Sequence, residues 1–176
     1  MVGALTLRNP GLPEGKHWNY ALGFRHDNGM RMSNQFYTGA RITVCTNGMI
    51  SGEPIYAHKH TVGYDIVADA NRIIGEYLKR SERVTADMGA MKQFGITRKD
   101  ADHLLCEAGS RGIMPWSRIG KVHNEYMNPT FSEFNENDNA WALYNACTYV
   151  VQEASEAVQV ETIKDFGDFI LEKAVA

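Results

Sequence analysis

The segment 66–79, IVADANRIIGEYLK, has the apolar periodicity of an α-helix. Apolar residues recur there at the three- and four-residue spacing of one helix face, while Asp69 and Glu76 fall between them. Acidic side chains come early in the pattern and basic ones late, which suits the helix dipole. The apolar period continues to Phe94 and predicts one long helix that ends at Gly95.

The chain before this helix has the signals of β-strands. Residues 18–60 hold aromatic and β-branched runs separated by turn residues, and Asn47-Gly48 is the strongest hairpin signal among them. We predict an antiparallel β-meander of three to four strands over 18–60. Residues 1–17 include a run rich in Pro and Gly, which predicts an N-terminal loop.

The chain after Gly95 continues with helical patterns. Thr97 and Asp100 have the spacing of a capping box at a helix start. We predict further helices from there to Gly109 or Gly112, from 115 to 126 and from 139 to 158, and a last short helix over 163–171. Because strands and helices are segregated, the expected fold class is α+β in a single domain, 1–176, whose helical part is 61–176.

Composition excludes several protein classes. Hydrophobic residues make up 44% and charged residues 22% of the 176 positions, as in globular domains. No apolar run reaches the roughly 18 residues of a membrane span, and the apolar run at the start is too short for a signal peptide. The spacing of Cys45, Cys106 and Cys147 matches no zinc or redox motif, which predicts free thiols and a cytoplasmic location.

Charge is distributed unevenly along the chain. Residues 1–60 hold six Lys and Arg against three Asp and Glu, whereas residues 124–176 hold two against ten. This asymmetry is compatible with a nucleic-acid-binding face beside an acidic final third. The alternative is that the acidic residues line the solvated faces of C-terminal helices.

Aromatic and basic residues are interleaved in the predicted sheet. A sheet that carries both can stack bases and neutralise phosphates. The alternative is that most of the rings fill the core under the long helix. The residues that we predict to bind nucleic acid are Arg25, Arg31, Tyr37, Arg41, Tyr56 and Lys59.

Two weaker site patterns lie in the same region. His58 and His60 are two positions apart, so in a strand both imidazoles share a face and could bind one metal. Cys45 beside Arg41 could be an activated thiol with either histidine as its base. The alternatives are a polar sheet surface for the histidines and a packed Cys at a strand end, and we predict no metal and no cofactor.

A third pattern is the segment RGIMPWSR, residues 111–118. An exposed Trp116 between Arg111 and Arg118 in a loop with Gly and Pro would form an interaction loop. The same Trp could equally plug the space between two helices.

Several motifs resemble one family. They are the segment 41–48, RITVCTNG; the residues His58-Lys59-His60-Thr61; the segment 139–148, NAWALYNACT; and the stretch 23–29, which contains His26-Asp27. Together they resemble the phage/plasmid-like proteins of domain of unknown function 932, over residues 20–152. The resemblance implies a phage or mobile-element origin, hence the host cytoplasm, and supplies no reaction.

These observations predict an accessory protein that binds nucleic acid, single strands included, or a nucleic-acid-handling complex. One alternative is an interaction module that inhibits a host factor through the acidic residues 124–176. The other is an enzyme that uses Cys45 with His58 or His60, or a metal on those histidines, and we consider an enzyme the weaker reading. Exposed sheet edges predict a homo-oligomer, and no membrane partner is expected.

Overall fold

A computed structural model describes the backbone of residues 2–7, 18–25, 34–42, 48–50, 56–58, 66–134 and 138–175. It describes side chains from residue 72 onward, except at 74, 77–81, 133, 135–137, 156–157 and 175–176. The helices are α1 (Ile66–Gln93), α2 (Arg98–Ser110), α3 (Trp116–Met127), α4 (Ala140–Val151) and α5 (Glu156–Val175), with a short 3₁₀ turn, η1, at Ser132–Phe134.

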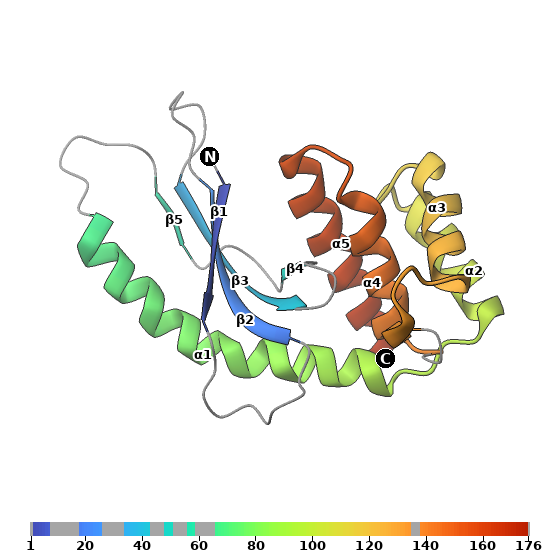
Figure 1. Cartoon of the computed structure of the whole chain (residues 1–176), viewed down its shortest axis with the longest axis horizontal. Coiled ribbons are helices and arrows are strands. Elements are labelled where there is room, and N and C mark those ends of the chain that lie inside the picture. The colour runs from blue at the N-terminus through green and yellow to red at the C-terminus, as the bar shows by residue number, and fades with distance from the viewer. Residues whose placement is uncertain are drawn as a thin grey trace.

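The predicted α+β class is wrong for the part of the chain whose side chains are described. Residues 72–176 are 79% helix, with five helices and no strand among them. Helices and the links between them build the core there, because its buried apolar residues run from Val84 in α1 to Ile170 in α5 and include Ile96 and Met114. The helices therefore form a packed body of their own, and they do not simply cover a sheet (Figure 1).

The strands of the N-terminal part also differ from the predicted meander. They are β1 (Val2–Leu7), β2 (Trp18–Arg25), β3 (Asn34–Ile42), β4 (Gly48–Ile50) and β5 (Tyr56–His58), and their order is β1-β2-β3-β4 with β5 on β3. β1 lies within 1–17, where we expected only a loop. β4 and β5 pair with different parts of β3, and β2 also pairs with β3. β3 is therefore an interior strand.

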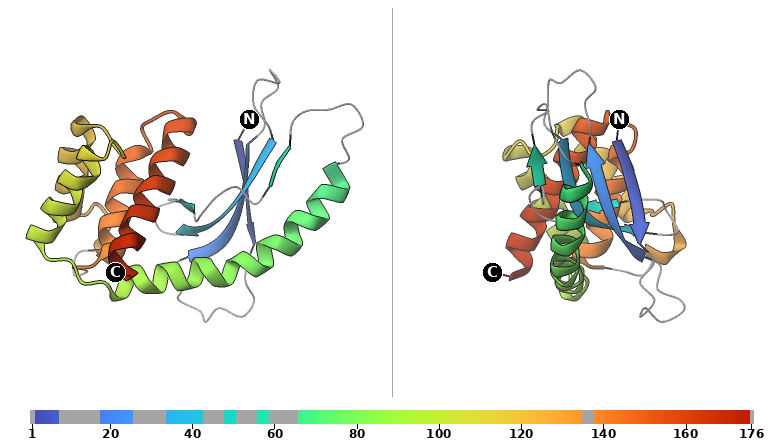
Figure 2. Two further views of the ribbon diagram at one scale, coloured as in Figure 1. Left: turned by 180° about the vertical axis from the view of Figure 1, so that it is seen from behind. Right: turned by 90° about the vertical axis from the view of Figure 1, so that its left-hand side faces the viewer.

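Helix α1 joins the sheet to the helical body. It runs along the sheet and continues under α4 and α5, as both views of the ribbon show (Figures 1 and 2). On its N-terminal half Ile73 is only 1% exposed, and on its C-terminal half Met88 and Met91 belong to the helical core. The apolar face of α1 is therefore buried beside the sheet at Ile73 and within the helical core in its C-terminal half.

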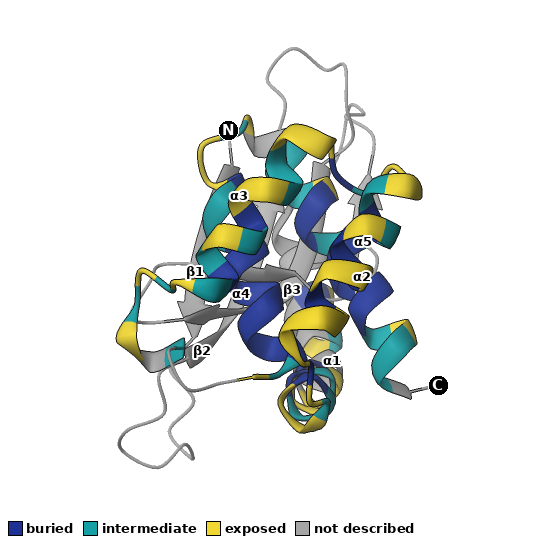
Figure 3. Cartoon of the chain, turned by 90° about the vertical axis from the view of Figure 1, so that its right-hand side faces the viewer, coloured by how far each residue is buried: buried dark blue, intermediate teal, exposed yellow. Residues whose placement is uncertain are grey.

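Helix α4 lies at the centre of the helical body. Every residue from Ala140 to Thr148 is buried, so this helix has no solvated face (Figure 3). Two polar side chains inside it bond to its own backbone: Asn145 donates to the carbonyl of Trp141 at 2.7 Å, and Thr148 donates to that of Asn145 at 2.9 Å. Each of these bonds gives a buried donor a partner, whereas Oδ1 of Asn145 is buried with no hydrogen-bond partner among the described residues.

The single helix predicted over 139–158 is wrong. The chain turns between α4 and α5, and the side-chain amide of Gln159 donates to the carbonyls of Gln152 and Ala154 at 2.9 and 2.8 Å. The first of these bonds satisfies the carbonyl of the C-cap of α4, and the second satisfies a carbonyl in the turn itself. The last helix, α5, is also long, at 20 residues, where we expected a short one over 163–171.

The capping box at the start of α2 is confirmed. The backbone N–H of Asp100 donates to Oγ1 of Thr97 at 3.2 Å, and the backbone N–H of Thr97 donates to the Asp100 carboxylate at 3.0 Å. After this helix, Gly112 has a φ of 74°, which Gly adopts at little cost. Gly112, and not Gly109, is thus the glycine that follows the helix end.

Replacing Thr97 with Ala should lower the free energy of unfolding by about 1 kcal/mol, because the N–H of Asp100 loses its acceptor. Thr97→Ser keeps the oxygen and is the matched control. Urea unfolding followed by circular dichroism measures both variants. Equal stability of the Ala and Ser variants would contradict a stabilising cap.

Among the helices whose residues are described, none has the length and apolar character needed to cross a membrane.

Candidate nucleic-acid interface

Three of the residues predicted to bind nucleic acid occupy positions on one face of the sheet. Arg25 of β2 pairs with Gln35 of β3, which lies two positions before Tyr37 and six before Arg41. Directly paired residues share a face, and so do residues at even separations along a strand. Positions 25, 37 and 41 therefore belong to the same face.

The two faces of the sheet differ in composition. Small and polar residues dominate the first, which we call the arginine face: Asn19, Ala21, Gly23, Arg25, Gln35, Tyr37, Gly39 and Arg41. Apolar residues are the majority in the opposite set of β2 and β3: Trp18, Tyr20, Leu22, Phe24, Asn34, Phe36, Thr38, Ala40 and Ile42. Such a division is typical of an antiparallel sheet with one face toward a core and one toward solvent.

Tyr56 and His58 belong to the opposite face. Tyr56 pairs with Phe36 and His58 pairs with Asn34, and both partners have even numbers on β3, whereas Tyr37 and Arg41 are odd. The register thus separates Tyr56 from the arginines with which we grouped it.

Four other predicted site residues, Arg31, Cys45, Lys59 and His60, lie outside the described residues. The pairing of Cys45 with a histidine, and of His58 with His60, therefore stays a prediction. Within the described part of the chain no three His, Cys, Asp or Glu side chains converge as metal ligands.

The two other cysteines differ in their surroundings. Cys106 is exposed on α2, whereas Cys147 is fully buried in α4, and both are free thiols. Burial raises the pKa of the Cys147 thiol far above its ordinary value, because the anion would lose its hydration. Cys147 is therefore a neutral packing residue at neutral pH.

Two residues of the predicted interaction loop, Trp116 and Arg118, lie in helix α3. Trp116 is 59% exposed and begins α3, but its ring also lies against Gly109 of α2, where an added Cβ would come within 3.1 Å of it. Arg118 is half-buried on α3. The Trp side chain thus covers Gly109 and still presents most of its surface, while its role in an interaction stays a prediction.

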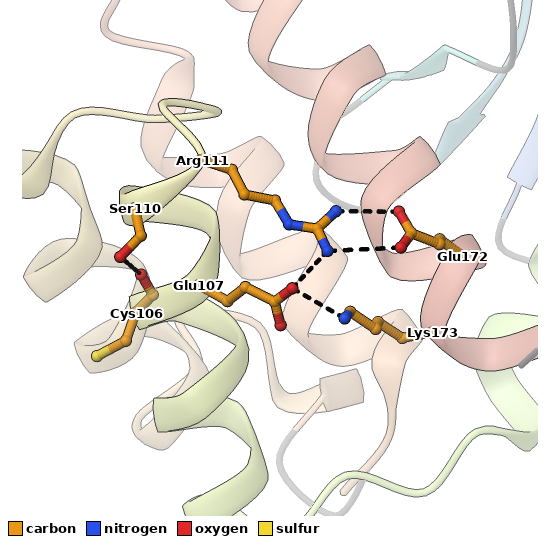
Figure 4. Close-up of polar contacts among 6 residues, drawn as sticks. All are labelled: Cys106, Glu107, Ser110, Arg111, Glu172 and Lys173. Atoms are coloured by element: carbon orange, nitrogen blue, oxygen red, sulfur yellow. Dashed lines mark hydrogen bonds and ion pairs between the residues drawn. The ribbon is translucent and has the colours of Figure 1, made fainter.

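Arg111 contributes to a network that links α2 to α5 (Figure 4). Its guanidinium donates to both carboxylate oxygens of Glu172, at 3.1 and 3.5 Å, and pairs with Glu107. Lys173 also donates to Glu107, at 2.9 Å. Both cations lie over the ring of Phe169, at 5.1 Å for Arg111 and 5.5 Å for Lys173.

The network shifts the titration of its members. The hydrogen bond from Lys173 holds the pKa of Glu107 below its ordinary value, and the bond to Glu172 raises the pKa of Arg111. Both groups therefore stay charged at neutral pH. Because these ion pairs join α2 to α5, the Arg111 guanidinium has a structural role in the helical body.

The acidic final third is partly neutralised within the structure. Glu172 pairs with Arg111, Glu153 with Lys121 at 3.3 Å, and Asp168 with Lys164 at 3.1 Å. Each of these ion pairs is exposed enough for solvent to screen it. The carboxylates that could contact a basic partner are thus fewer than the sequence count indicates.

Two contacts of α3, one with α2 and one with the segment before α2, were not predicted from the sequence. His123 pairs with Asp102 at 2.9 Å, and the Tyr126 hydroxyl donates to the carbonyl of Ile96 at 3.0 Å. Burial raises the pKa of Tyr126 to about 12. Both contacts join residues more than twenty positions apart, so no local sequence motif predicts them.

A groove of about 400 Å³ lies near the start of α2, lined in part by Phe94, His103 and Leu104. Its two charged residues already have partners. Asp100 bonds to Thr97, and Lys173 bonds to Glu107. Both of these charged side chains are therefore already engaged within the protein.

The late motif of the family resemblance contributes to the core. Trp141, Asn145, Ala146 and Thr148 are all buried in α4, and the Asn139 side chain caps this helix by accepting from the Ala142 N–H at 2.9 Å. No family model, no curated protein and no solved structure matches the chain.

Proposed function

We propose that the chain is a phage or mobile-element accessory protein that binds nucleic acid through the arginine face. One observation carries the proposal: the strand register brings the positions of Arg25, Tyr37 and Arg41 to one face, the one composed of small and polar residues. We include Arg31 and Lys59 among the proposed binding residues because of their places in the sequence alone. We also propose that the chain is related to the family it resembles and that it acts in the host cytoplasm.

The chemistry of this set suits nucleic acid. Guanidinium groups are planar, always charged and able to bond phosphate through two donors. A tyrosine ring offers a base a stacking surface. Residues 1–60 also carry a surplus of positive charge, although the whole chain is negative at −3. Attraction of phosphate would therefore be local to this part of the molecule.

The double variant Arg25→Ala with Arg41→Ala should weaken binding and flatten its salt dependence. Each lost phosphate contact should lower the slope of log affinity against log salt by about 0.7 on a single strand. Fluorescence anisotropy of a labelled oligonucleotide, titrated at several salt concentrations, measures both quantities. Circular dichroism would show that the variant is folded.

The matched control is Arg98→Ala with Lys99→Ala, which removes the same charge from exposed positions on α2. We expect its salt slope to stay at the wild-type value. If both double variants lose affinity equally, binding follows net charge and the assignment to the arginine face is wrong.

An interaction module that acts through residues 124–176 is the second candidate. Its acidic surplus favours a basic partner, while the ion pairs of Glu153, Asp168 and Glu172 reduce the free negative charge. Absence of any nucleic-acid binding at low salt would make this candidate the leading one. Self-association through the sheet edges also remains a proposal.

A further inference from the structure

We propose that the arginine face takes a single strand of nucleic acid, laid along the interior strand β3, with Tyr37 as the stacking residue between two arginine positions. This inference rests on the proposed function, and it names the class of nucleic acid. The juxtaposition that carries it is the placement of positions 25, 37 and 41 at three levels of one face.

The spacing of the three positions limits the length of the bound strand. Arg25 is level with Gln35, so it is six residues from Arg41 along β3, about 20 Å at the rise of a strand. Stacked nucleotides place one phosphate about every 3.4 Å along a strand. The face therefore spans no more than about six nucleotides, and fewer if the strand is stretched.

The interior position of β3 disfavours a duplex. β2 pairs along one side of β3, while β5 pairs at Asn34–Phe36 and β4 at Gly39–Arg41 on the other. From β1 to β4 there are three strand spacings, about 14 Å before side chains are counted. The major groove of DNA is about 12 Å wide and admits a helix or a two-stranded ribbon.

A base edge inside a duplex groove therefore cannot reach position 37, whereas an unpaired base can be splayed onto it. The neighbouring positions support this role. Gly23 pairs directly with Tyr37, and Gly39 is the next residue of β3 on the same face. Neither glycine adds a side chain to the face, whereas Ile50, the β4 partner of Gly39, belongs to it.

The test uses the full chain and fluorescein-labelled oligothymidines of 2, 4, 6, 8 and 12 nucleotides, with a 20-base-pair duplex as the comparison. We expect affinity to rise with length up to about six nucleotides and then to gain only the few-fold advantage of additional registers. The duplex should bind at least about tenfold more weakly, since its bases are paired and stacked.

Tyr37→Ala should weaken binding of the six-nucleotide strand by about 5- to 150-fold, the loss of one stacked base. Tyr37→Phe keeps the ring and should stay within about twofold of wild type. The length series uses the wild-type chain, so it tests the inference even if the Ala variant fails to fold.

The outcomes separate the two proposals. Equal affinity for duplex and single strand, with the arginine double variant still impaired, overturns the single-strand inference and leaves the proposed function in place. Affinity that keeps rising steeply beyond about six nucleotides, or a Tyr37→Ala variant that binds like wild type, overturns it too. Binding of neither nucleic acid at low salt overturns the proposed function itself.

Discussion

Replacing Phe166 with Ala should lower the free energy of unfolding by about 3–5 kcal/mol. Phe166 is 0% exposed on α5, and its ring lies 6.1 Å from that of Phe169, centroid to centroid. Removing the ring leaves a cavity among α5 and its neighbours that close packing prevents from collapsing fully. Urea unfolding, followed by circular dichroism at 222 nm, measures the loss.

The matched control is Trp116→Ala, which also deletes a large aromatic side chain. Trp116 is the exposed large hydrophobic residue of the described part of the chain, so its removal should cost under about 1 kcal/mol. Comparable losses in the two variants would contradict a core centred on α4 and α5.

Replacing Gly167 with Leu should destabilise the chain by about 1–3 kcal/mol, the cost of overpacking. A Cβ at this position would lie 3.1 Å from Cε2 of Tyr144, which is itself 0% exposed. The Tyr144 ring is enclosed, so relief requires that α4 and α5 separate. The usual gain of replacing a helical Gly opposes this cost by about 1 kcal/mol.

Gly120→Leu is the control, because a Cβ at this exposed position of α3 meets no atom within 4 Å. We expect that variant to be as stable as wild type or more stable by up to about 1 kcal/mol. Thermal unfolding of both variants distinguishes close packing from a general effect of leucine. A Gly167→Leu variant as stable as the Gly120→Leu variant would mean that α5 does not approach Tyr144 this closely.

Local signals in the sequence predicted local features well. The long helix over 66–94 is α1, the capping box at Thr97 is present, and Gly112 follows the end of α2. Each of these features depends on residues within a few positions of one another. Helical periodicity and capping chemistry are therefore sufficient to predict them.

Features that depend on distant partners were not predictable. The helix expected over 139–158 showed a plausible polar side, yet α4 is buried all round because other helices surround it. The turn after Val151 depends on Gln159, and Arg111 finds Glu172 sixty-one positions away. Periodicity in one segment contains no information about which segments will cover it.

The candidate site shows the same division. Composition alone indicated a mixture of basic and aromatic residues before residue 65, but it did not indicate on which face each one lies. A shift of one residue in register exchanges the faces of a strand. Only the pairing of β3 with β2 and β5 separates Tyr37 and Arg41 from Tyr56.

The length of α1 has an electrostatic consequence. Its 28 residues extend about 42 Å, and they hold the sheet at one end of the molecule and the helical body at the other (Figure 2). Residues 1–60 carry a net charge of +3 and residues 124–176 a net charge of −8. Because α5 contacts β4 and screening in physiological salt acts over roughly 10 Å, part of the acidic region lies near enough to the sheet to weaken its attraction for an anion. The charge of the chain is thus asymmetric along its sequence, and we expect a polyanion that approaches it to turn toward residues 1–60 before any contact forms.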